Sequence, residues 1–484
     1  MLPSSLRRAC FVLLPCFAAA GLHAQPQPAA GRSVTKLYTD LCLSCHGQKW
    51  EGGRAPSMLD DVWMHESDDE GLARSIRDGW PVNAMPGFGA VLNPQEIRAM
   101  VVFIRESRER AKQEKKTPPP EIDGVQFNSE KQRFKIEVVA AGLETPWGMA
   151  FMPDGRLMVT ERPGRLRIVA PGKGVVETIS GVPKVWLKQD GGLFDLALHP
   201  NFAREPWVYL AYSDTGGAQA NASGTTIIRA KLSGNALVDH QTLFKAPPEQ
   251  YWVSNTHYGA RFLFDRAGFL YFSIGDRGRR DEAQNLASPY GKFHRIHDDG
   301  RVPADNPFVN TPGAVKTIWS WGHRNQQGMA QNPTTGEIWT TEHGPRGGDE
   351  LNVIGRGKNY GWPVITYGMN DDGTPITDQT AKAGMEQPVA YWTPSIAVSG
   401  IEFYSGDKFP AWRNNLFMAA LAGRQFRRIE MDGHKVTHQE VLLQDLGRRV
   451  RDVQAGPDGL IYVLLNMEFG ESPGHVIRLV PVAK

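Results

Sequence analysis

The pattern of hydrophobic positions changes near residue 120, and the first part of the chain has the spacing of helices. Its apolar residues recur every three or four positions in two sets, Val34, Leu37, Tyr38 and Leu41, then Ile97, Met100, Val101 and Ile104. Asn93 suits the N-cap of the second helix, with Pro94 at its first position and Glu96 at its third. We therefore predict a small all-α domain over residues 25–117.

After residue 132 the pattern becomes one of short alternating strands separated by turns. One phrase recurs six times, a turn of Pro, Asp, Asn or Gly residues followed by an alternating run, at residues 152–155, 199–201, 265–268, 332–336, 405–407 and 456–459. Six copies of one β-unit predict a closed radial array, so residues 133–484 should form an all-β six-bladed propeller. A pair of β-sandwiches is the alternative, and sandwiches lack such a repeated phrase.

The composition supports a turn-rich β domain after the helical one, and it restricts the classes of binding partner. Gly (51), Pro (34) and Trp (13) are plentiful, as in a turn-rich β protein. Lys and Arg total 54 against 52 for Asp and Glu, and no basic block is interleaved with aromatics, so nucleic acid is a poor candidate partner. Residues 105–120 become charged and then proline-rich, which predicts a semi-rigid linker over 118–132.

The first 24 residues have the form of a secretory signal. Arg7 and Arg8 precede a short apolar run over 11–20, and a small-x-small cleavage site ends at Ala24. We therefore expect export to the periplasm. A membrane anchor is the alternative, but the run is too short to span a bilayer and Pro15 interrupts it. No later stretch is long and apolar enough, so no integral membrane segment is predicted.

Export makes the cysteines informative. Of the 4 cysteines, Cys10 and Cys16 leave with the signal, and the mature chain keeps Cys42 and Cys45. A close pair in an exported protein could form a disulfide or a redox pair. The residue after the pair favours haem c instead, because His46 completes a Cys-x-x-Cys-His run in which both thiols bond to the ring and the imidazole coordinates iron.

A haem iron of this type takes a sixth ligand, commonly a Met thioether from a later loop. Met85 is the first candidate, because Pro86 and Gly87 keep its segment out of a helix. The other candidates are Met58, Met64 and Met100, of which Met100 belongs to the helical stripe. A helix, the haem pair, a Met loop and a closing helix follow the order of a class I cytochrome c, which this segment resembles. His46 and Met85 are thus the predicted iron ligands.

Four loop clusters in the second domain hold more polar residues than turns require. They are Gln-Asp-Gly-Gly-Leu at 189–193, His-Tyr-Gly-Ala-Arg at 257–261 with Gly-Asp at 275–276, residues 321–328 with 342–352, and residues 447–453. Together with the runs at 300–308 and 357–363, they resemble the soluble quinoprotein sugar dehydrogenases over nearly all of residues 140–484. The aldose sugar dehydrogenase branch is the most similar, and it uses pyrroloquinoline quinone (PQQ) on a six-bladed propeller.

The resemblance implies a dehydrogenase of aldose sugars. Oxidising a sugar hemiacetal needs a base for the hydroxyl proton and an acceptor for the hydride. The resemblance assigns the base to His257, with Asp276 orienting its other nitrogen. Asp190, with Gln189 before it, stands where the family often has Gln or Glu, and either could hold the base or the substrate. The alternative for a single His is an ordinary surface or core imidazole.

PQQ is a flat tricarboxylate quinone, so its rim calls for Arg side chains. The resemblance places Arg324, Arg449 and Arg451 around it, with Arg324 near the reacting carbonyl, and Asn325 and Gln327 at its amide positions. Ordinary surface charge is the alternative for the Arg residues.

Two further assignments concern the same pocket. Ala422 stands where the family has a cofactor-contacting Lys, and Arg424 is the substitute. Ca²⁺ accepts backbone carbonyls, and the resemblance places Gly344 and Pro345 at an active-site Ca²⁺, where a plain turn is the alternative. A second, structural Ca²⁺ would use Glu350 and the Tyr360 carbonyl.

The prediction is thus a periplasmic fusion that oxidises aldoses to lactones and passes electrons through haem c to a soluble cytochrome, a copper protein or the respiratory chain. A calcium-dependent lactonase is one alternative, which would need acidic Ca²⁺ ligands from several blades. A propeller that only binds a glycan or a protein is the other. The sequence leaves open the preferred sugar, the docking of the two domains and whether the protein forms a homodimer.

Overall fold

The N-terminal domain is helical, as the apolar spacing predicts. The computed structural model describes residues 32–116, 118–119, 121–467 and 473–482, so the predicted signal peptide lies outside the described residues. The helices are α1 (Val34–Leu41), α2 (Leu43–His46), α3 (Asp69–Asp78) and α4 (Pro94–Glu114), with a 3-10 turn η1 (Pro81–Asn83). α4 begins with the predicted capping box, in which Asn93 Oδ1 accepts from the Glu96 backbone at 2.9 Å and Glu96 Oε2 accepts from the Asn93 backbone at 3.1 Å.

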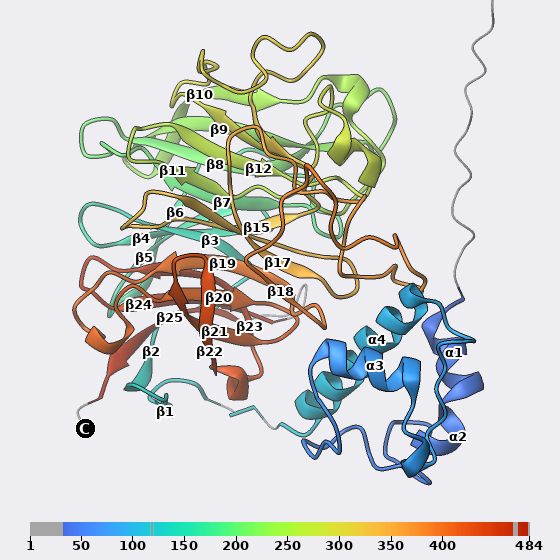
Figure 1. Cartoon of the computed structure of the whole chain (residues 1–484). Helices are drawn as coiled ribbons and strands as arrows, with labels where there is room; N and C mark the ends of the chain where they lie inside the picture. Colours follow the sequence, from blue (N-terminus) through green and yellow to red (C-terminus); the bar gives the residue numbers. More distant parts are fainter. Residues whose placement is uncertain (1–31, 117, 120, 468–472, 483–484) are drawn as a thin grey trace, which may run out of the picture.

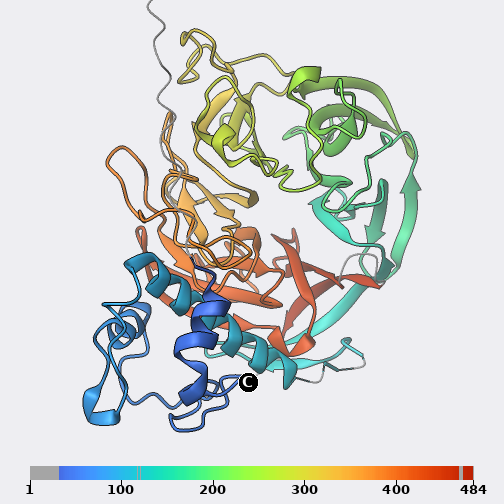
Figure 2. The same cartoon turned by 90° about the vertical axis from the view of Figure 1, so that its right-hand side faces the viewer.

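The remainder of the described chain forms six antiparallel sheets set around a ring (Figure 2). Blade 1 holds β3 (Pro146–Phe151), β4 (Leu157–Glu161), β5 (Arg165–Ala170) and β6 (Gly174–Ile179). Blade 2 holds β7 (Leu193–Leu198), β8 (Trp207–Thr215), β9 (Ser223–Ser233) and β10 (Ala236–Lys245). Blade 3 holds β11 (Phe262–Phe264), β12 (Leu270–Ile274), β13 (Lys292–Ile296) and β14 (Ile318–Trp321).

The last three blades complete the ring. Blade 4 holds β15 (Gln326–Gln331), β16 (Ile338–Glu342), β17 (Asp349–Val353) and β18 (Ala390–Trp392). Blade 5 holds β19 (Val398–Phe403), β20 (Leu416–Ala420), β21 (Gln425–Asp432) and β22 (Lys435–Leu442). Blade 6 holds β23 (Arg449–Ala455), β24 (Ile461–Asn466) and β25 (Gly474–Pro481), and it is completed by β2 (Arg133–Leu143) and β1 (Gln126–Asn128). The prediction of a cytochrome-like helical domain followed by a six-bladed propeller is confirmed.

The repeated turn has the same place in every blade. All six copies connect the first strand of a blade to its second strand, as at 152–155 between β3 and β4 and at 456–459 between β23 and β24. Most candidate site residues of the propeller belong to the opposite end of the strands, in or next to the connections that enter the first strand or leave the second. The exceptions are Glu350, which lies in β17, and Tyr360, which follows β17. The repeat therefore marks one face of the propeller, and the polar loop clusters mark the other.

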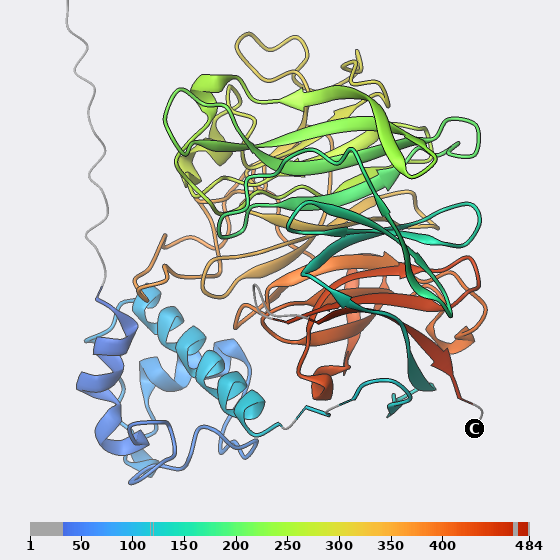
Figure 3. The same ribbon diagram turned by 180° about the vertical axis from the view of Figure 1, so that it is seen from behind.

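The helical domain lies beside the propeller on one of these faces, to one side of the centre of the ring (Figures 1 and 2). α4 is the helix closest to the propeller loops, and the view from behind shows the same arrangement (Figure 3). No helix in the described part of the chain has both the length and the apolar character that a membrane crossing needs.

Candidate active site

The two catalytic candidates meet at the entrance to blade 3. His257 precedes β11 and Asp276 follows β12, and His257 Nδ1 lies 2.6 Å from Asp276 Oδ1. The Asp276 side chain is buried, while the His257 ring keeps about a fifth of its surface exposed. Gly275 allows this close approach, because a Cβ there would lie 2.3 Å from the His257 carbonyl oxygen. An imidazole that donates Nδ1–H to a buried carboxylate presents Nε2 as a proton acceptor.

Asp276 is held by several donors. The Gly278 backbone N–H donates to Oδ1 at 2.8 Å, and the Trp362 indole N–H donates to Oδ2 at 2.8 Å. Burial acts to raise the pKa of Asp276, but the hydrogen bond and charge of His257 and the charge of Arg324 hold that pKa below its usual value. The carboxyl is therefore ionised at neutral pH and can stabilise a positive charge on His257.

Asp190 and Gln189 differ in their relation to this pair. The Asp190 carboxylate accepts from the His257 backbone N–H at 3.3 Å, and its own N–H donates to the Asn255 carbonyl at 3.0 Å. Gln189 is exposed and has a left-handed backbone (φ 47°), and its carbonyl accepts from Arg162. The structure thus brings Asp190 to the base, and it places the Gln189 side chain at the surface.

Arg324 connects the catalytic pair to the next loop. Its Nη1 donates to the Gly344 carbonyl at 2.6 Å and to the His343 carbonyl at 3.1 Å, and its own carbonyl accepts from the Asp276 N–H at 2.7 Å. The Gly344 N–H donates to Asp349 Oδ1 at 2.9 Å, and Pro345 follows half-buried. Arg324 and the predicted calcium loop are therefore neighbours.

The amide candidates and Arg451 form one network on the first strands of blades 4 and 6. Gln327 Oε1 accepts from Arg451 Nη1 at 2.9 Å, and Gln327 Nε2 donates to Asn325 Oδ1 at 3.1 Å. Burial, followed by the charges of Arg261 and Arg449, lowers the pKa of Arg451 well below its usual value. Arg451 Nε is buried without a hydrogen-bond partner in the described residues, and so is His343 Nε2. Unpaired donors among crowded cations suit an anionic ligand.

The remaining Arg candidates border this network. Arg449 begins β23, two residues before Arg451, and is half-buried. Arg424 is half-buried with a left-handed backbone (φ 49°), in the connection between β20 and β21. Ala422 is exposed, and its carbonyl accepts from Gln113 of α4 at 3.2 Å. The position where the family has a Lys thus contacts the helical domain.

A second group of polar side chains surrounds Glu350. Glu350 of β17 lies directly opposite Glu342 of β16, which in turn lies opposite Gln326 of β15. Burial, and after it the charge of Glu342, raises the pKa of Glu350 to about 8. Asn352 Nδ2 donates to Glu350 at 3.0 Å, while Asn352 Oδ1 is buried without a partner among the described residues. Tyr360 is buried and stacks on His323, which bonds to Glu342 at 2.8 Å.

In the helical domain, Cys42 separates α1 from α2 and Cys45 lies within α2, which ends at His46. Both thiols are free and partly buried, so the disulfide alternative is not seen. Burial, followed by the charge of Cys45, raises the pKa of Cys42 to about 11. His46 Nδ1 is buried and unpaired within the described part of the chain.

Met85 lies in the loop after η1, where it forms an isolated bridge with Trp80 through backbone bonds of 2.8 and 3.1 Å. Its side chain is half-buried. Met100 is almost fully buried in the core of the helical domain, and Met58 packs against that core. Met64 keeps 61% of its surface exposed. Met100 thus belongs to the packed core of the helical domain, while Met85 lies in a non-helical loop.

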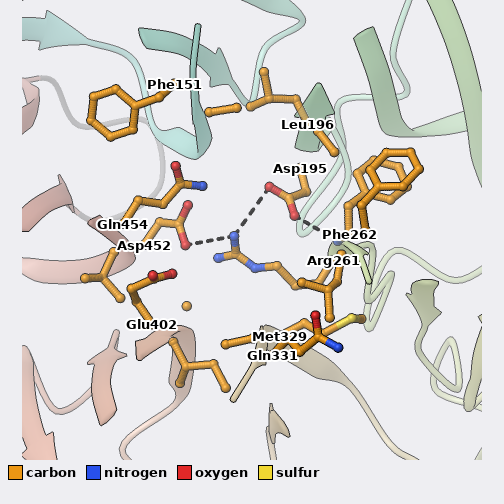
Figure 4. A pocket seen from close by; sticks show the side chains of 18 of the residues that line it. Phe151, Asp195, Leu196, Arg261, Phe262, Met329, Gln331, Glu402, Asp452 and Gln454 are labelled. Atoms are coloured by element: carbon orange, nitrogen blue, oxygen red, sulfur yellow. Dashed lines mark hydrogen bonds and ion pairs between the residues drawn. The ribbon is translucent and has the colours of Figure 1, made fainter. Parts of the chain in front are cut away.

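Behind the candidate site, Arg261 closes the centre of the propeller (Figure 4). Its guanidinium lies 2.9 Å from Asp452 and 3.4 Å from Asp195, and it donates to the backbone carbonyls of Gln327 and Arg451. Beyond it a cavity of about 430 Å³ is lined by the first strands of all six blades. Arg261 therefore fixes the two strands that carry Gln327 and Arg451.

Five contributors were not predicted from the sequence: Trp362, His343, Arg261, Glu342 and Gln326. Four of them, all except Arg261, lie within two positions of a predicted site residue in the same sequence motif. Arg261 ends the His-Tyr-Gly-Ala-Arg run. Their position in these motifs was the sequence signal that could have indicated them. The motifs alone do not distinguish residues of the site from residues that only support the fold.

Comparison with known proteins places these observations in a family. Residues 143–478 match the family described as Glucose / Sorbosone dehydrogenase, and residues 29–104 match Cytochrome C oxidase, cbb3-type, subunit III. Aldose sugar dehydrogenase YliI of Escherichia coli is 42% identical over 351 residues, 72% of this chain and 92% of that protein. In the helical domain, the cbb3-type cytochrome c oxidase subunit FixP of Bradyrhizobium diazoefficiens is 32% identical over 72 residues, 14% of this chain and 24% of that protein.

Solved structures agree. The apo-form of the soluble aldose sugar dehydrogenase of Escherichia coli is 42% identical with a TM-score of 0.68, covering 72% of this chain and 100% of that one. The PQQ-bound form of the aldose sugar dehydrogenase of Streptomyces coelicolor is 28% identical with a TM-score of 0.58, covering 75% of this chain and 100% of that one. The chain belongs to the glucose/sorbosone dehydrogenase family and carries a cytochrome c domain in front of its propeller.

Proposed function

We propose that the chain is a periplasmic quinohaemoprotein that oxidises aldoses at C1 to lactones. PQQ would supply the hydride acceptor when bound, and haem c would supply the route for electrons to a downstream one-electron acceptor. The observation that supports this best is the hydrogen-bonded His257–Asp276 pair beside Arg324, together with Arg451 Nε, which is buried without a partner among the described residues, in a family of sugar dehydrogenases. Export follows from the predicted signal peptide.

His257 acts as the base in this proposal. Because Nδ1 is bonded to Asp276, Nε2 accepts the proton of the C1 hydroxyl as hydride leaves the carbon. The buried carboxylate fixes the tautomer and stabilises the imidazolium that forms, as in other His–Asp pairs. Asp190, bonded to the His257 backbone, holds the loop that carries the ring.

The pocket beside the pair suits a tricarboxylate. PQQ would supply a hydride-accepting quinone when bound, and a Ca²⁺ ion held by this loop would supply Lewis-acid polarisation. Arg324, Arg449 and Arg451 would hold the anionic rim, with Arg424 replacing the family's Lys. Asn325 and Gln327 hold Arg451 at the required orientation through the amide network.

The two proposed Ca²⁺ ions would take oxygen ligands from these loops. The carbonyls of Gly344 and Pro345 would serve the active-site ion, since a carbonyl that already accepts from Arg324 retains a second lone pair. Glu350 and the Tyr360 carbonyl would serve the structural ion. Glu342 and the unpaired Asn352 Oδ1 add hard oxygen ligands there, and a divalent cation would offset the repulsion between the two glutamates.

The helical domain would hold the haem. Cys42 and Cys45 provide the thioether bonds, and His46 and Met85 the iron ligands. The free, adjacent thiols and the unpaired, buried ring nitrogen of His46 are consistent with this assignment.

One experiment tests the proposal. Purified full-length protein, loaded with PQQ and Ca²⁺, should reduce its own haem when an aldose is added, which is followed by haem absorption. His257→Ala should slow this reduction by roughly 10²–10⁴-fold, because general-base catalysis is lost, without changing the oxidised haem spectrum. His240→Ala, at an exposed imidazole, is the control and should react at the wild-type rate. No haem reduction by any aldose would reject the dehydrogenase, and a wild-type rate in His257→Ala would reject His257 as base.

A further inference from the structure

Helix α4 of the cytochrome domain lies against the propeller loops that form the candidate quinone pocket (Figures 1 and 3). Arg98, near its start, donates Nη2 to the Thr377 carbonyl at 2.6 Å, and two further groups of contacts lie near its middle and near its C-terminal end. The first group reaches the loop after β16, which carries Gly344 and Pro345. The second reaches the loop after β20, which carries Ala422 and Arg424. One helix therefore touches two of the loops that the proposed function places around PQQ.

The first contact is an ion pair. Arg346, directly after Pro345, donates Nε to both oxygens of Glu106 at 2.8 and 3.0 Å, and its Nη2 lies 2.7 Å from Oε2. The two side chains keep only 20% and 16% of their surface exposed. A forked Arg–carboxylate pair fixes orientation as well as distance, and its partial burial protects it from screening by salt.

Apolar packing supports the ion pair. Gly347 is backed by Val102 of α4, whose Cγ1 would lie 3.2 Å from a Cβ on that glycine. Met369 is almost fully buried in the hydrophobic core of the cytochrome domain, although it belongs to the propeller chain. Met369 and Arg346 exchange two backbone hydrogen bonds of 2.9 and 3.1 Å. The calcium-binding loop of the proposal is thus tied to the cytochrome core.

The second contact fixes the other end of the helix. Glu109 accepts from Gln444 at 2.9 Å, and Lys116 lies 2.8 Å from Asp445. Gln113 donates to the Ala422 carbonyl at 3.2 Å. Ala422 stands at the position where the family has a Lys. Because its side chain is short, a side chain of α4 can reach the backbone of Ala422. The helix is thus bonded to the propeller at separate points along its length.

We infer that this face of α4 is a fixed docking surface that positions the cytochrome domain for electron transfer, and that Arg346 and Glu106 are its positioning pair. The inference rests on the proposed function. Oxidation of one aldose releases two electrons and two protons. A bound haem c would supply a one-electron acceptor, and a downstream acceptor would take both electrons onward in single steps. Docking holds the cytochrome domain against the loops of the candidate quinone pocket, and neither residue takes part in the sugar chemistry.

Two readouts on the full-length, PQQ- and Ca²⁺-loaded protein separate docking from catalysis. An artificial dye that takes electrons directly from the reduced quinone measures sugar oxidation, and stopped-flow absorption measures haem reduction. In Glu106→Gln we expect haem reduction to slow about tenfold or more, because the partly buried Arg346 loses its partner. Dye reduction should stay at the wild-type rate.

The matched control is Glu114→Gln, the same change at an exposed position of the same helix, which should leave both rates unchanged. The double variant Glu106→Arg/Arg346→Glu exchanges the two charges. Its haem should be reduced faster than the haem of the single variant Glu106→Arg. Wild-type haem reduction in Glu106→Gln, or no recovery in the exchanged pair, would overturn the docking role. Absence of dye reduction in the wild-type protein would instead reject the proposed function, and this inference with it.

Discussion

At the scale of single residues, Asp276 is the most constrained group of the candidate site, because its two oxygens accept from three donors. Oδ1 accepts from His257 and from the Gly278 backbone, and Oδ2 accepts from Trp362. An Asn side chain has one acceptor oxygen and one donor nitrogen. In Asp276→Asn, the new amide nitrogen would face an N–H donor in either orientation of the side chain. In one orientation that donor is Trp362, and in the other the donors are His257 and Gly278.

We therefore predict that Asp276→Asn lowers kcat for sugar oxidation by roughly 10²–10⁴-fold, because the imidazole loses its tautomer control and its counter-charge. Dye-linked turnover measures this effect. Asp281→Asn, at an exposed carboxylate of η3 (Arg280–Gln284), is the control. Equal kcat in Asp276→Asn and in the control would show that the carboxylate does not act through His257.

The sequence predicted the members of this site better than their contacts. Family motifs indicated His257 and Asp276, and the structure places the two in direct contact. Trp362, which also bonds Asp276, lies 86 positions away in the chain. Such a bond depends on how blades 3 and 4 are set around the ring. The spacing of apolar residues along a single strand or helix carries no information about how the blades are placed around the ring.

At the scale of elements, α4 shows what local sequence does determine. The Asn93, Pro94 and Glu96 signals predicted its start, and both bonds of the capping box are present. The turn phrases likewise predicted six β-units, since each phrase depends on a few adjacent residues, and each phrase forms the turn between the first two strands of a blade. The pairing of β2 with β25 was not predicted, because it joins residues such as Phe134 and Pro481 from opposite ends of the propeller domain.

The cap has a measurable consequence. Asn93→Ala removes the acceptor for the Glu96 backbone N–H and should destabilise the cytochrome domain by about 1 kcal/mol. For a domain of this size that corresponds to a Tm lower by roughly 4–8 °C, followed by haem absorption during thermal unfolding. Asn93→Ser keeps a capping oxygen and should unfold near the wild-type temperature. An unchanged Tm in Asn93→Ala would mean that the cap contributes nothing to the domain's stability.

At the scale of the whole molecule, the ring of blades is closed by β2, a strand that precedes the first blade in the sequence. β2 pairs with β25 from Phe134 opposite Pro481 to Leu143 opposite Gly474. Phe134 and Ile136 of β2 are fully buried in a cluster shared with blades 5 and 6. The sequence could not settle whether the two domains dock, because the contacts of α4 join segments more than 200 residues apart.

This closure distinguishes two truncations of the N-terminal region. A chain starting at residue 121 loses the cytochrome domain but keeps β1 and β2, whereas a chain starting at 144 also loses both strands. The first should fold and reduce a dye with sugar, since the Escherichia coli structure covered by this chain spans the propeller region. The second exposes the edge of β25 and removes buried side chains worth about 1.5–3 kcal/mol each, which exceeds the usual margin of stability once several are lost. Thermal unfolding followed by circular dichroism compares the two, and equal unfolding temperatures would show that blade 6 does not need β2.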